Sequence, residues 1–466
     1  VMSMIICSVS GCYLSIIFMY LEIYKYVYQL SGCHSTGSRP KLYKFLLSLG
    51  FVFSAHPGRV NWRTVSTGLL IQFLFGVLFI RWTPGRVALQ CFSDKVATFL
   101  SYGVEGAAFA FGDLLVKTEG VFAFSTLPVI FFFSMLVEML FFWGALQWFC
   151  LKLGLLLRSA TGTTVCESVI AVGNVFLGMT ESVLLVKPYL AVQTPSELHV
   201  VMSSGFATVS GTILASYIGF GAEPAHLVTA SVMSAPAAIC YSKLLMPETK
   251  RSLTTVDNIH EDQSVLSAAT RGATNGIALI LNIIANIIAF VAFIAFINGA
   301  LGYFGGMLGN PDINLEWILG KVFIPLSWVM GVPWEECELV GSLIGLKTVV
   351  NEFVAYQRMG EMKREGLLSV GIFYPRSELI ATYSLCGFTN PASAGIMIGA
   401  IAAMAPNQRE VLSSVSFIKS FLRDSSSFID SAFFLVVATV DSGFQELQWL
   451  GMCGGLVPIK KKETSH

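Results

Sequence analysis

The fold is decided by one stretch, Gly345-Leu346-Lys347-Thr348-Val349-Val350-Asn351-Glu352-Phe353-Val354-Ala355-Tyr356. It places Lys347, Asn351 and Glu352 inside an otherwise apolar span. Hydrocarbon offers an ionisable side chain no hydrogen bonds, so such a residue at bilayer depth is expected to face a wet cavity, a partner or a ligand. Glu352 is therefore a candidate functional residue. The competing interpretation is a structural glutamate satisfied by Lys347 or by helix-end amides.

A second stretch of the same kind lies far earlier, at Gly173-Asn174-Val175-Phe176-Leu177-Gly178-Met179-Thr180-Glu181-Ser182. It again puts an asparagine and a glutamate among apolar residues and glycines. Ionisable residues inside membrane-spanning segments are rare and mark binding sites or ion pathways. Two such stretches favour a functional interpretation, in which Glu181 and Glu352 meet in one aqueous chamber halfway through the bilayer.

The composition is that of a membrane protein. Of the 466 residues, 54% are hydrophobic and only 12% are charged, and the mean hydropathy is +0.69. These values exclude an ordinary soluble globular protein and indicate a polytopic membrane protein. The formal net charge is zero, so no strongly basic surface argues for a nucleic-acid partner. The ten cysteines lie scattered without a CxxC pair, which favours buried small hydrophobes over a metal centre.

Apolar runs predict the segments that cross the membrane. An uncharged run at residues 1–21 is interpreted as a span, and residues 65–82 as another. Residues 85–115 mix charged and aromatic residues, which suits an amphipathic helix along the interface better than a crossing one. Residues 122–157 exceed one bilayer thickness and predict a span followed by a surface helix. Within that run, Glu138 is interpreted as a pairing residue.

Residues 160–186 form an apolar but interrupted segment. It is broken too often for one clean span, yet it is too apolar for a loop. It predicts a re-entrant hairpin, two half-helices that meet inside the membrane at a tip around Gly173-Asn174. Non-helical backbone at that depth survives only where protein or a wet cavity satisfies its polar groups. The following span, residues 200–220, carries small polar residues that permit an unwound midpoint.

The second half of the chain repeats this order. Residues 318–356 form another interrupted apolar segment ending in the Asn351-Glu352 motif, a charged linker follows at 357–377, and residues 379–404 form a span broken around Pro391. A hairpin followed by a broken helix, twice over, is typical of a secondary transporter with its site at the bilayer midplane. The predicted fold class is an all-α polytopic membrane protein, an inverted-repeat transporter with two re-entrant helical hairpins and two broken transmembrane helices.

The opening stretch, written Gly345-x-Lys347-x-x-x-Asn351-Glu352-Phe353-Val354-Ala355-Tyr356, resembles the signature of the concentrative nucleoside transporters. The likeness runs from about residue 56 to residue 406 in the family's order, and the extra N-terminal segments resemble the vertebrate-type branch. Further segments similar to that family are Gly178-Met179-Thr180-Glu181-Ser182, Lys187-Pro188-Tyr189-Leu190, Ala230-Ser231-Val232-Met233-Ser234-Ala235-Pro236, Pro247-Glu248-Thr249 and Ala381-Thr382-Tyr383-Ser384-Leu385-Cys386-Gly387-Phe388. The resemblance implies a sodium-coupled nucleoside symporter that works by alternating access, not an enzyme.

The resemblance places the nucleobase at the first hairpin tip and the ribose at the second hairpin. Ribose hydroxyls would donate to Glu352, because a carboxylate accepts two hydrogen bonds that are roughly twice as strong as neutral ones. The implied base contacts are Gly178, Met179, Thr180 and Glu181 at the tip, with Thr212 and Ile213 from the first broken helix. The implied ribose contacts beside Glu352 are Phe388, Asn390 and Ser393 from the second broken helix.

The resemblance also implies a sodium site between the first hairpin and the first broken helix. Its ligands by position are Asn174, Leu177, Thr208 and Val209, with Leu177 and Val209 acting through backbone carbonyls. Sodium is a hard cation that takes oxygen ligands, and carbonyls freed by unwinding supply them without burying another formal charge. Sodium is therefore the expected coupling ion, and no cofactor is implied.

Met179 departs from many relatives, which carry glutamine there. Glutamine donates and accepts at a pyrimidine edge, whereas the polarizable methionine thioether suits a larger aromatic base. Gly178 and Met179 with Thr212 resemble the purine-preferring members. The hypothesis is a purine preference covering adenosine, guanosine or inosine, with uridine as a further candidate. Pro391 is a second departure, and it leaves the helix geometry around it open.

Family likeness implies a homotrimer in the plasma membrane, with nucleoside, sodium and the lipid bilayer as partners and no nucleic acid. The segments follow as N-terminal spans (1–55), scaffold spans with an interfacial helix (56–157), first hairpin and broken-helix repeat (158–271), scaffold or trimer span (272–317), second repeat with the last span (318–440) and C-terminal tail (441–466). A proton-coupled or facilitative transporter of another polar solute is the alternative. An intramembrane enzyme or a channel lacks a supporting motif.

Overall fold

The computed structural model describes residues 47–48, 50–118, 121–209, 211–250, 252, 264–307, 309, 313–330, 332–365, 375–388 and 390–415. The predicted span at 1–21, most of the predicted last span at 411–440 and the tail at 441–466 lie outside the described residues. In the described part of the chain, every regular element is a helix.

The first described helices run as far as α6. They are η1 (Pro57–Arg59), α3 (Trp62–Gly76), the π-helical turn η2 (Val77–Arg81), α4 (Thr83–Phe111), the π-helical turn η3 (Leu114–Thr118), α5 (Phe122–Ser125) and α6 (Val129–Phe142). Residues 122–157, predicted as a span followed by a surface helix, are divided among the short helix α5, α6 and α7 (Ala145–Thr161). Gly144 separates α6 from α7 at φ 70°, a left-handed conformation that glycine adopts without steric penalty.

The first hairpin and broken helix follow α7. The elements are α8 (Val165–Phe176), α9 (Glu181–Leu184), η4 (Lys187–Val192), α10 (Pro195–Ala207), α11 (Gly211–Gly219) and α12 (Pro224–Leu245). The predicted break in residues 200–220 is confirmed, since helix stops at Ala207 and resumes at Gly211. The predicted tip at Gly173-Asn174 is wrong, because both residues are inside α8 and the chain turns at Leu177 to Thr180.

Gly173 serves helix packing rather than turning. A Cβ there would lie 2.5 Å from Cδ1 of Leu185, so only glycine lets the returning half of the hairpin approach α8 this closely. Glycine inside an apolar segment marks either a turn or a close contact, and hydropathy does not separate the two.

The second half of the chain begins with a long helix. The elements are α13 (Val265–Met307), α14 (Leu315–Val329), η5 (Trp334–Glu336), α15 (Cys337–Val349), α16 (Glu352–Arg364), α17 (Pro375–Leu385), α18 (Pro391–Met404), η6 (Pro406–Gln408) and α19 (Arg409–Val415). The predicted break in residues 379–404 is confirmed between α17 and α18. Pro391 takes the first turn of α18, where its missing N–H is no loss, which settles the geometry there.

The predicted second hairpin segment, residues 318–356, is too short, because its second helix continues to Arg364. Val350-Asn351 is the turn of the second hairpin, and the first part of the predicted charged linker at 357–377 is helix α16. The Asn351 side chain accepts from the Val354 N–H at 2.9 Å and so begins a new helix. The charges of α16 are compatible with this position because they pair, for example Lys363 with Glu378 at 2.6 Å.

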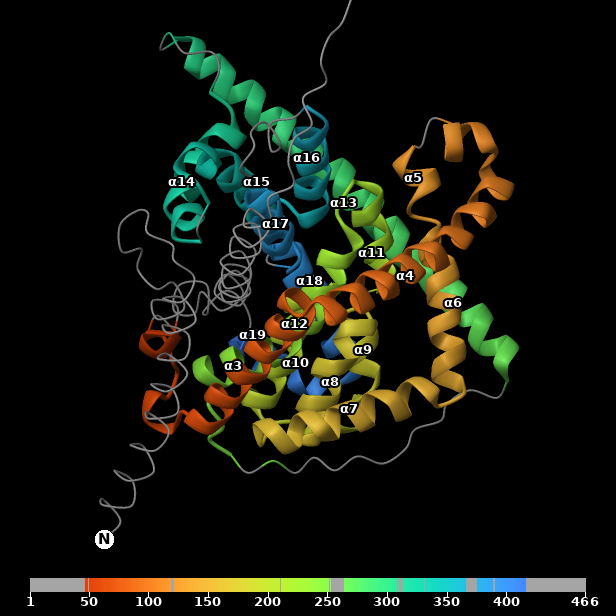
Figure 1. The fold of residues 1–466 in the computed structure, drawn as a ribbon, viewed down its shortest axis with the longest axis vertical. Helices are drawn as coiled ribbons and strands as arrows, with labels where there is room; N and C mark the ends of the chain where they lie inside the picture. The colour runs from red at the N-terminus through yellow and green to blue at the C-terminus, as the bar shows by residue number, and fades with distance from the viewer. Residues whose placement is uncertain are drawn as a thin grey trace, which may run out of the picture.

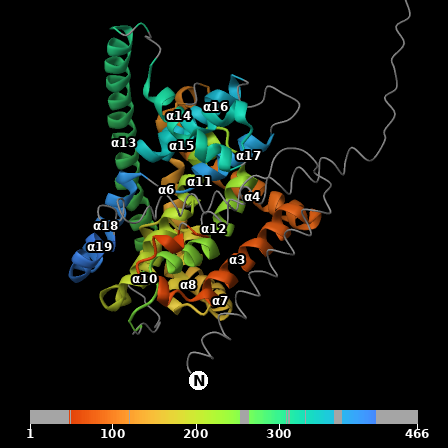
Figure 2. The ribbon, with the colours of Figure 1, turned by 90° about the vertical axis from the view of Figure 1, so that its left-hand side faces the viewer.

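The two hairpins lie at opposite ends of the molecule, with the broken helices between them (Figures 1 and 2). Helices α8 and α9 occupy the lower end in Figure 1, and α15 and α16 the upper end. By length and composition, four helical stretches in the described chain are able to cross a membrane: Trp62–Phe79, Ala123–Phe142, Pro224–Leu245 and Ile283–Met307.

Burial separates a central helix from a peripheral one. In the apolar window of α12, 89% of the residues are buried inside the protein, against 12% in the window of α13. Helix α12 is therefore central, and it packs against α8 of the first hairpin and against α10 and α17 of the two broken helices. Helix α13 runs along one side of the molecule and presents its apolar residues outward (Figure 2).

The broken helices touch where each is interrupted. The N–H of Phe388, between α17 and α18, donates to the carbonyl oxygen of Phe206, in the last turn of α10, at 2.7 Å. Breaking a helix frees backbone donors and acceptors that hydrocarbon cannot satisfy. Here a backbone N–H freed by one interruption pairs with a backbone carbonyl next to the other, so the two repeats meet through their backbone.

A buried charged cluster ties three helix ends together. Thr164 and Thr194 begin α8 and α10 with capping boxes, in which Glu167 and Glu197 bond back to the threonine N–H. Lys243 of α12 forms an ion pair with Glu167, whose side chain is only 1% exposed. The Lys243 Nζ also donates to the Ser196 hydroxyl at 2.9 Å. Both helix starts are thereby fixed to the end of α12.

Candidate binding site at the crossing of the broken helices

Glu352 is the first residue of α16, directly after the turn of the second hairpin, and it is 3% exposed. Asn390 Nδ2 donates to Glu352 Oε2 at 2.6 Å. The Asn390 Oδ1 in turn accepts from the Ser393 N–H at 2.9 Å and from the Ser393 hydroxyl at 3.1 Å. The break of the second broken helix therefore orients the carboxylate through the cap of α18.

Lys347, near the end of α15 in the second hairpin, is 1% exposed. Its Nζ donates to the carbonyl oxygen of Ser384 at 2.6 Å, in the last turn of α17. The Tyr356 hydroxyl donates to the carbonyl oxygen of Thr382 at 2.8 Å. A cation at a helix C-terminus complements the negative end of the helix dipole. These bonds fasten the second hairpin to the first half of its broken helix.

At the tip of the first hairpin, the Glu181 carboxylate lies against Gly178. A Cβ at Gly178 would overlap the Glu181 carboxylate, so this position has room for hydrogen only. Thr180 Oγ1 donates to Glu181 Oε2 at 3.0 Å. A cleft opens beside the tip. It is lined by Leu177, Gly178, Glu181 and Leu184 from the hairpin and by Phe133, Ser134, Val137, Glu138 and Phe141 from α6.

The α6 wall of that cleft carries a second carboxylate. Glu138 accepts from Arg271 of α13 at 2.8 Å, which confirms the pairing role predicted for it. The ion pair joins two helices that are distant in sequence, and it faces the wall that carries Glu181. The cleft therefore separates the hairpin from the α6–α13 pair.

Gly205 brings the first hairpin to the crossing point. A Cβ at Gly205 would lie 3.1 Å from Met179 Cβ and 3.1 Å from Met397 Cε, so the hairpin tip and α18 both pack on α10 at this glycine. Gly205 directly precedes Phe206, which bonds to Phe388. Contacts thus lead from Met179 in the first repeat to Phe388 in the second, two residues before Asn390.

The asparagine of the first hairpin is the centre of a polar network. Asn174 is fully buried in α8, and its Oδ1 accepts from the Ser182 hydroxyl at 2.6 Å. Its Nδ2 donates to the Ser204 hydroxyl of α10 at 3.0 Å. Thr208 Oγ1 donates to the Ser204 carbonyl oxygen at 2.9 Å. The network joins both halves of the hairpin to the break of the first broken helix.

The oxygens predicted to bind sodium fit a hard cation. Leu177 caps α8 and Thr208 caps α10, positions whose neighbouring carbonyls have no donor within the helix. The Val209 carbonyl accepts one hydrogen bond, from the Ser231 hydroxyl at 3.1 Å, and a carbonyl has two lone pairs. Asn174 Oδ1 also accepts one hydrogen bond, and Thr208 Oγ1 donates its proton to Ser204, so both oxygens have acceptor capacity left. The donor set is neutral oxygen throughout, which suits sodium.

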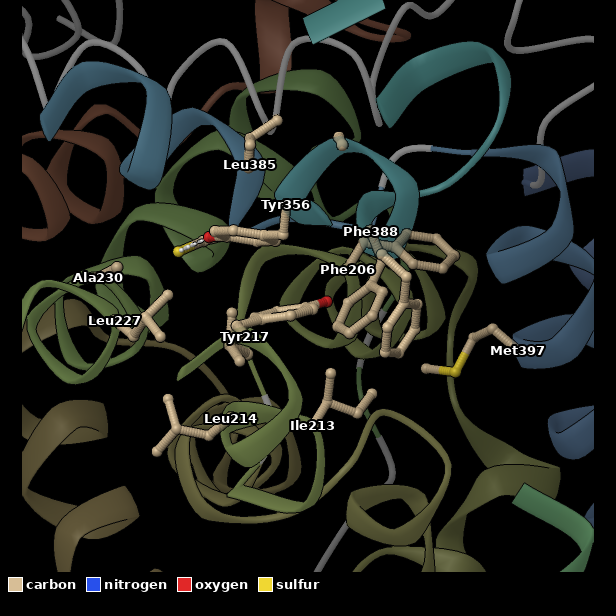
Figure 3. Packing of buried hydrophobic residues seen from close by; sticks show 14 of the residues in the cluster. Phe206, Ile213, Leu214, Tyr217, Leu227, Ala230, Tyr356, Leu385, Phe388 and Met397 are labelled. Atoms are coloured by element: carbon tan, nitrogen blue, oxygen red, sulfur yellow. Dashed lines mark hydrogen bonds between the residues drawn. The ribbon is translucent and has the colours of Figure 1, made fainter. Parts of the chain in front are cut away.

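The structure joins most of the residues predicted for the site. Glu352, Asn390 and Ser393 share hydrogen bonds, and Phe388 lies at the crossing. Ile213 packs in the same buried cluster as Phe206 and Phe388 (Figure 3). The side chain of Thr212 lies outside the described part. Glu181 accepts a hydrogen bond from Thr180, and Glu352 accepts one from Asn390. Among the described residues, no hydrogen bond links the residues of one pair to those of the other.

Sequence reasoning missed three hydroxyls around Asn174 and Val209. They are Ser182, Ser204 and Ser231. Ser182 and Ser204 carried a usable signal, because each is a polar residue within four positions of a predicted interruption. Ser231 lies in a segment that resembles the family, but nothing in that segment pointed to Val209, since only tertiary packing brings the two residues together.

Two hairpins and two broken helices that meet around a buried carboxylate and a neutral oxygen cluster define a membrane transporter of the inverted-repeat class. Family models match three successive parts of the chain. These are the Na+ dependent nucleoside transporter N-terminus at 43–114, nucleoside recognition at 123–224 and the Na+ dependent nucleoside transporter C-terminus at 226–432. The chain belongs to the Na+-dependent nucleoside transporter family.

Relatives from several vertebrates are similar over most of this chain. Solute carrier family 28 member 3 of Rattus norvegicus is 45% identical over 377 residues, covering 78% of this chain and 53% of the relative. Sodium/nucleoside cotransporter 2 of Rattus norvegicus is 42% identical over 83% of this chain and 60% of the relative. Sodium/nucleoside cotransporter 1 of Oryctolagus cuniculus is 41% identical over the same shares. The chain spans about half the length of the curated relatives it matches.

Solved structures show the same fold. CNTnw in an inward-facing, substrate-bound state is 35% identical, with a TM-score of 0.80 over 90% of this chain and 98% of that chain. A doubly substituted CNTnw in an outward-facing state also scores 0.80, at 35% identity over 87% and 97%. Because both states score equally, the likeness identifies the fold and not the conformational state.

Proposed function

We propose that the chain is a sodium-coupled nucleoside symporter of the plasma membrane, working by alternating access. The observation that carries the proposal is the buried Glu352 carboxylate, held by Asn390 at the point where the two broken helices meet. A buried carboxylate with one oriented amide partner has acceptor capacity left for further donors. A ribose diol supplies two such donors, and the family is one of nucleoside transporters.

The binding reaction follows from the two hairpins. Ribose hydroxyls donate to Glu352, while the base lies toward Met179 and Ile213, which pack near the same crossing. A sugar lacking one of these hydroxyls would leave the carboxylate one donor short, and an incompletely paired buried acceptor is costly. Selectivity for ribonucleosides is the result.

Sodium supplies the driving force. Sodium bound by Asn174, Leu177, Thr208 and Val209 fixes the first hairpin to the unwound part of the first broken helix. One positive charge crossing about 60 mV gains about 1.4 kcal/mol. That is roughly a tenfold accumulation of nucleoside before the sodium concentration gradient contributes.

Replacing external sodium with choline tests the coupling. Uptake of labelled inosine by cells expressing the chain is expected to fall to the background of untransfected cells. Uptake that is unchanged by the replacement would favour the proton-coupled or facilitative alternative. A rise on acidifying the choline medium would specify proton coupling.

Substitution of Asn174 tests the sodium site. Asn174→Leu keeps the approximate volume but removes a proposed oxygen ligand, so the sodium concentration for half-maximal uptake should rise roughly tenfold, the equivalent of one polar contact. The matched control is Asn407→Leu at an exposed position, which should leave the sodium dependence unchanged. Identical sodium curves for wild type and Asn174→Leu would remove this residue from the site.

A purine preference is the finer part of the proposal, and Met179 supports it. The Cβ of Met179 lies against Gly205, and the thioether beyond it offers no hydrogen-bond donor to a pyrimidine edge. In competition with labelled inosine, thymidine and cytidine should compete less well than adenosine and guanosine. Better transport of thymidine and cytidine than of inosine would refute the Met179 argument.

Met179→Gln tests the same point by gain of function. The added amide should raise cytidine uptake relative to inosine uptake roughly tenfold, about the value of one well-formed hydrogen bond. Met307→Gln, at an exposed position of α13, is the control and should leave the ratio alone. An unchanged ratio in Met179→Gln would mean that this side chain does not contact the base.

The division into moving and static parts, and the homotrimer, belong to the same proposal. The two hairpin and broken-helix repeats, proposed at 158–271 and 318–440, would move together against scaffold spans. The cleft between the first hairpin and α6 lies on that boundary. The long helix α13, within the proposed trimer span, exposes Leu281, Ile288, Phe293, Phe296 and Phe304. The native mass of the detergent-solubilised protein tests the trimer.

A further inference from the structure

Tyr217 of α11 is a fully buried phenol whose hydroxyl has no hydrogen-bond partner among the described residues. Two aromatic neighbours fix the position of its ring. It stacks on Tyr356 with ring centroids 4.2 Å apart and meets Phe353 edge-on at 5.5 Å. Packing therefore fixes the direction of the hydroxyl, while its hydrogen-bonding capacity is unused.

Tyr356, on which the Tyr217 ring stacks, shows that a phenol in this cluster is able to find a hydrogen-bond partner. The Tyr356 hydroxyl donates to the Thr382 carbonyl oxygen at 2.8 Å and lies 3.1 Å from Cys386 Sγ. Two parallel phenols in one cluster thus differ, one satisfied and one unsatisfied. Leaving a buried hydroxyl without a partner costs roughly 1–3 kcal/mol. Such a group in a native protein requires an explanation, and a ligand is one.

The Tyr217 hydroxyl points toward the proposed substrate chamber. It lies one helical turn after Ile213, so both residues share a face of α11. Figure 3 shows the hydroxyl directed away from Tyr356 toward the aromatic rings around Phe206 and Phe388, the residues whose backbones join the two broken helices. Phe353, against which the ring packs, directly follows Glu352.

We propose that the Tyr217 hydroxyl donates a hydrogen bond to a ribose hydroxyl oxygen of the bound nucleoside. The inference rests on the proposed function and adds a binding residue to it. Glu352 only accepts hydrogen bonds, whereas the phenol is able to donate one. A ribose hydroxyl that donates to Glu352 keeps lone pairs for such a donor. The two side chains together would recognise both roles of a sugar hydroxyl.

Tyr217→Phe removes the hydroxyl and keeps the ring. In saturating sodium, the inosine dissociation constant of the purified full chain should rise roughly 5- to 10-fold, the value of one hydrogen bond. The unfolding temperature without nucleoside should stay equal or increase, because the unpaired group is gone. Tyr102→Phe, exposed on α4, should change neither quantity. Tyr356→Phe, which removes a satisfied hydroxyl, should lower the unfolding temperature without nucleoside.

Inosine analogues lacking the 2′-, 3′- or 5′-hydroxyl identify the oxygen. The analogue that lacks the partner should bind wild type and Tyr217→Phe equally, while the other two keep the difference. The proposal is overturned if Tyr217→Phe binds inosine like wild type, if all three analogues keep the full difference, or if the variant loses stability without nucleoside as Tyr356→Phe does. Failure of the wild-type chain to bind inosine at all would instead refute the proposed function.

Discussion

Glu352→Gln is expected to weaken nucleoside binding about 100-fold. A neutral acceptor forms hydrogen bonds about 1–1.5 kcal/mol weaker than a charged one, and two ribose hydroxyls are affected. The single Gln oxygen must also serve Asn390, whose Nδ2 now donates to Glu352 Oε2 at 2.6 Å. The Gln amide would then turn a donor toward the ribose hydroxyls. Half-saturation of inosine uptake in sodium medium measures the effect.

Glu338→Gln is the matched control for this substitution. Glu338 lies in the same hairpin but forms an exposed pair with Lys321. Exposed pairs contribute little, so inosine uptake should keep its wild-type half-saturation. Equal half-saturation for Glu352→Gln and wild type would show that the carboxylate does not contact substrate, and it would leave the structural interpretation of this glutamate standing.

Lys243→Met is expected to destabilise the protein by about 3–5 kcal/mol, because breaking a buried pair leaves an uncompensated charge. The charge left behind is Glu167, whose side chain is 1% exposed at the start of α8. Ser196 at the start of α10 would lose its Lys243 contact as well. Thermal unfolding of the detergent-purified chain measures the change.

Lys321→Met provides the comparison. Its pair with Glu338 has the short distance of 2.6 Å, but the two side chains are 46% and 40% exposed. Solvent screening limits such a pair to about 0–1 kcal/mol. A similar loss of unfolding temperature in both variants would contradict the view that burial, and not bond length, makes the Lys243 cluster important.

The interruptions of the fold were predictable where sequence chemistry is local. Small polar residues near Thr208 predicted the first break, because they compete with the helix backbone for hydrogen bonds. The run around Pro391 predicted the second, because proline is accepted in the first turn of a helix but not in its interior. The limits of the hairpins were not. Gly173 marks a close helix contact instead of a turn, and α16 is a helix although its composition resembles a linker.

Long-range pairing explains the second of these errors. Arg358 of α16 forms an ion pair with Glu316 of α14, with Nε and Oε2 3.3 Å apart, so charges that look solvated in the sequence are partnered in the fold. The same limit applies to the site. Glu352 and Asn174 stood out as polar residues in apolar runs. The roles of Ser231 and Tyr217 depend on neighbours that the sequence order does not reveal.

The most direct measurement of the central claim is the uptake of labelled sodium by proteoliposomes containing the purified chain, with and without inosine outside. Symport through one chamber predicts that inosine accelerates sodium entry and that Glu352→Gln abolishes the acceleration at inosine concentrations that saturate wild type. Inosine entry without any increase in sodium entry would contradict the account.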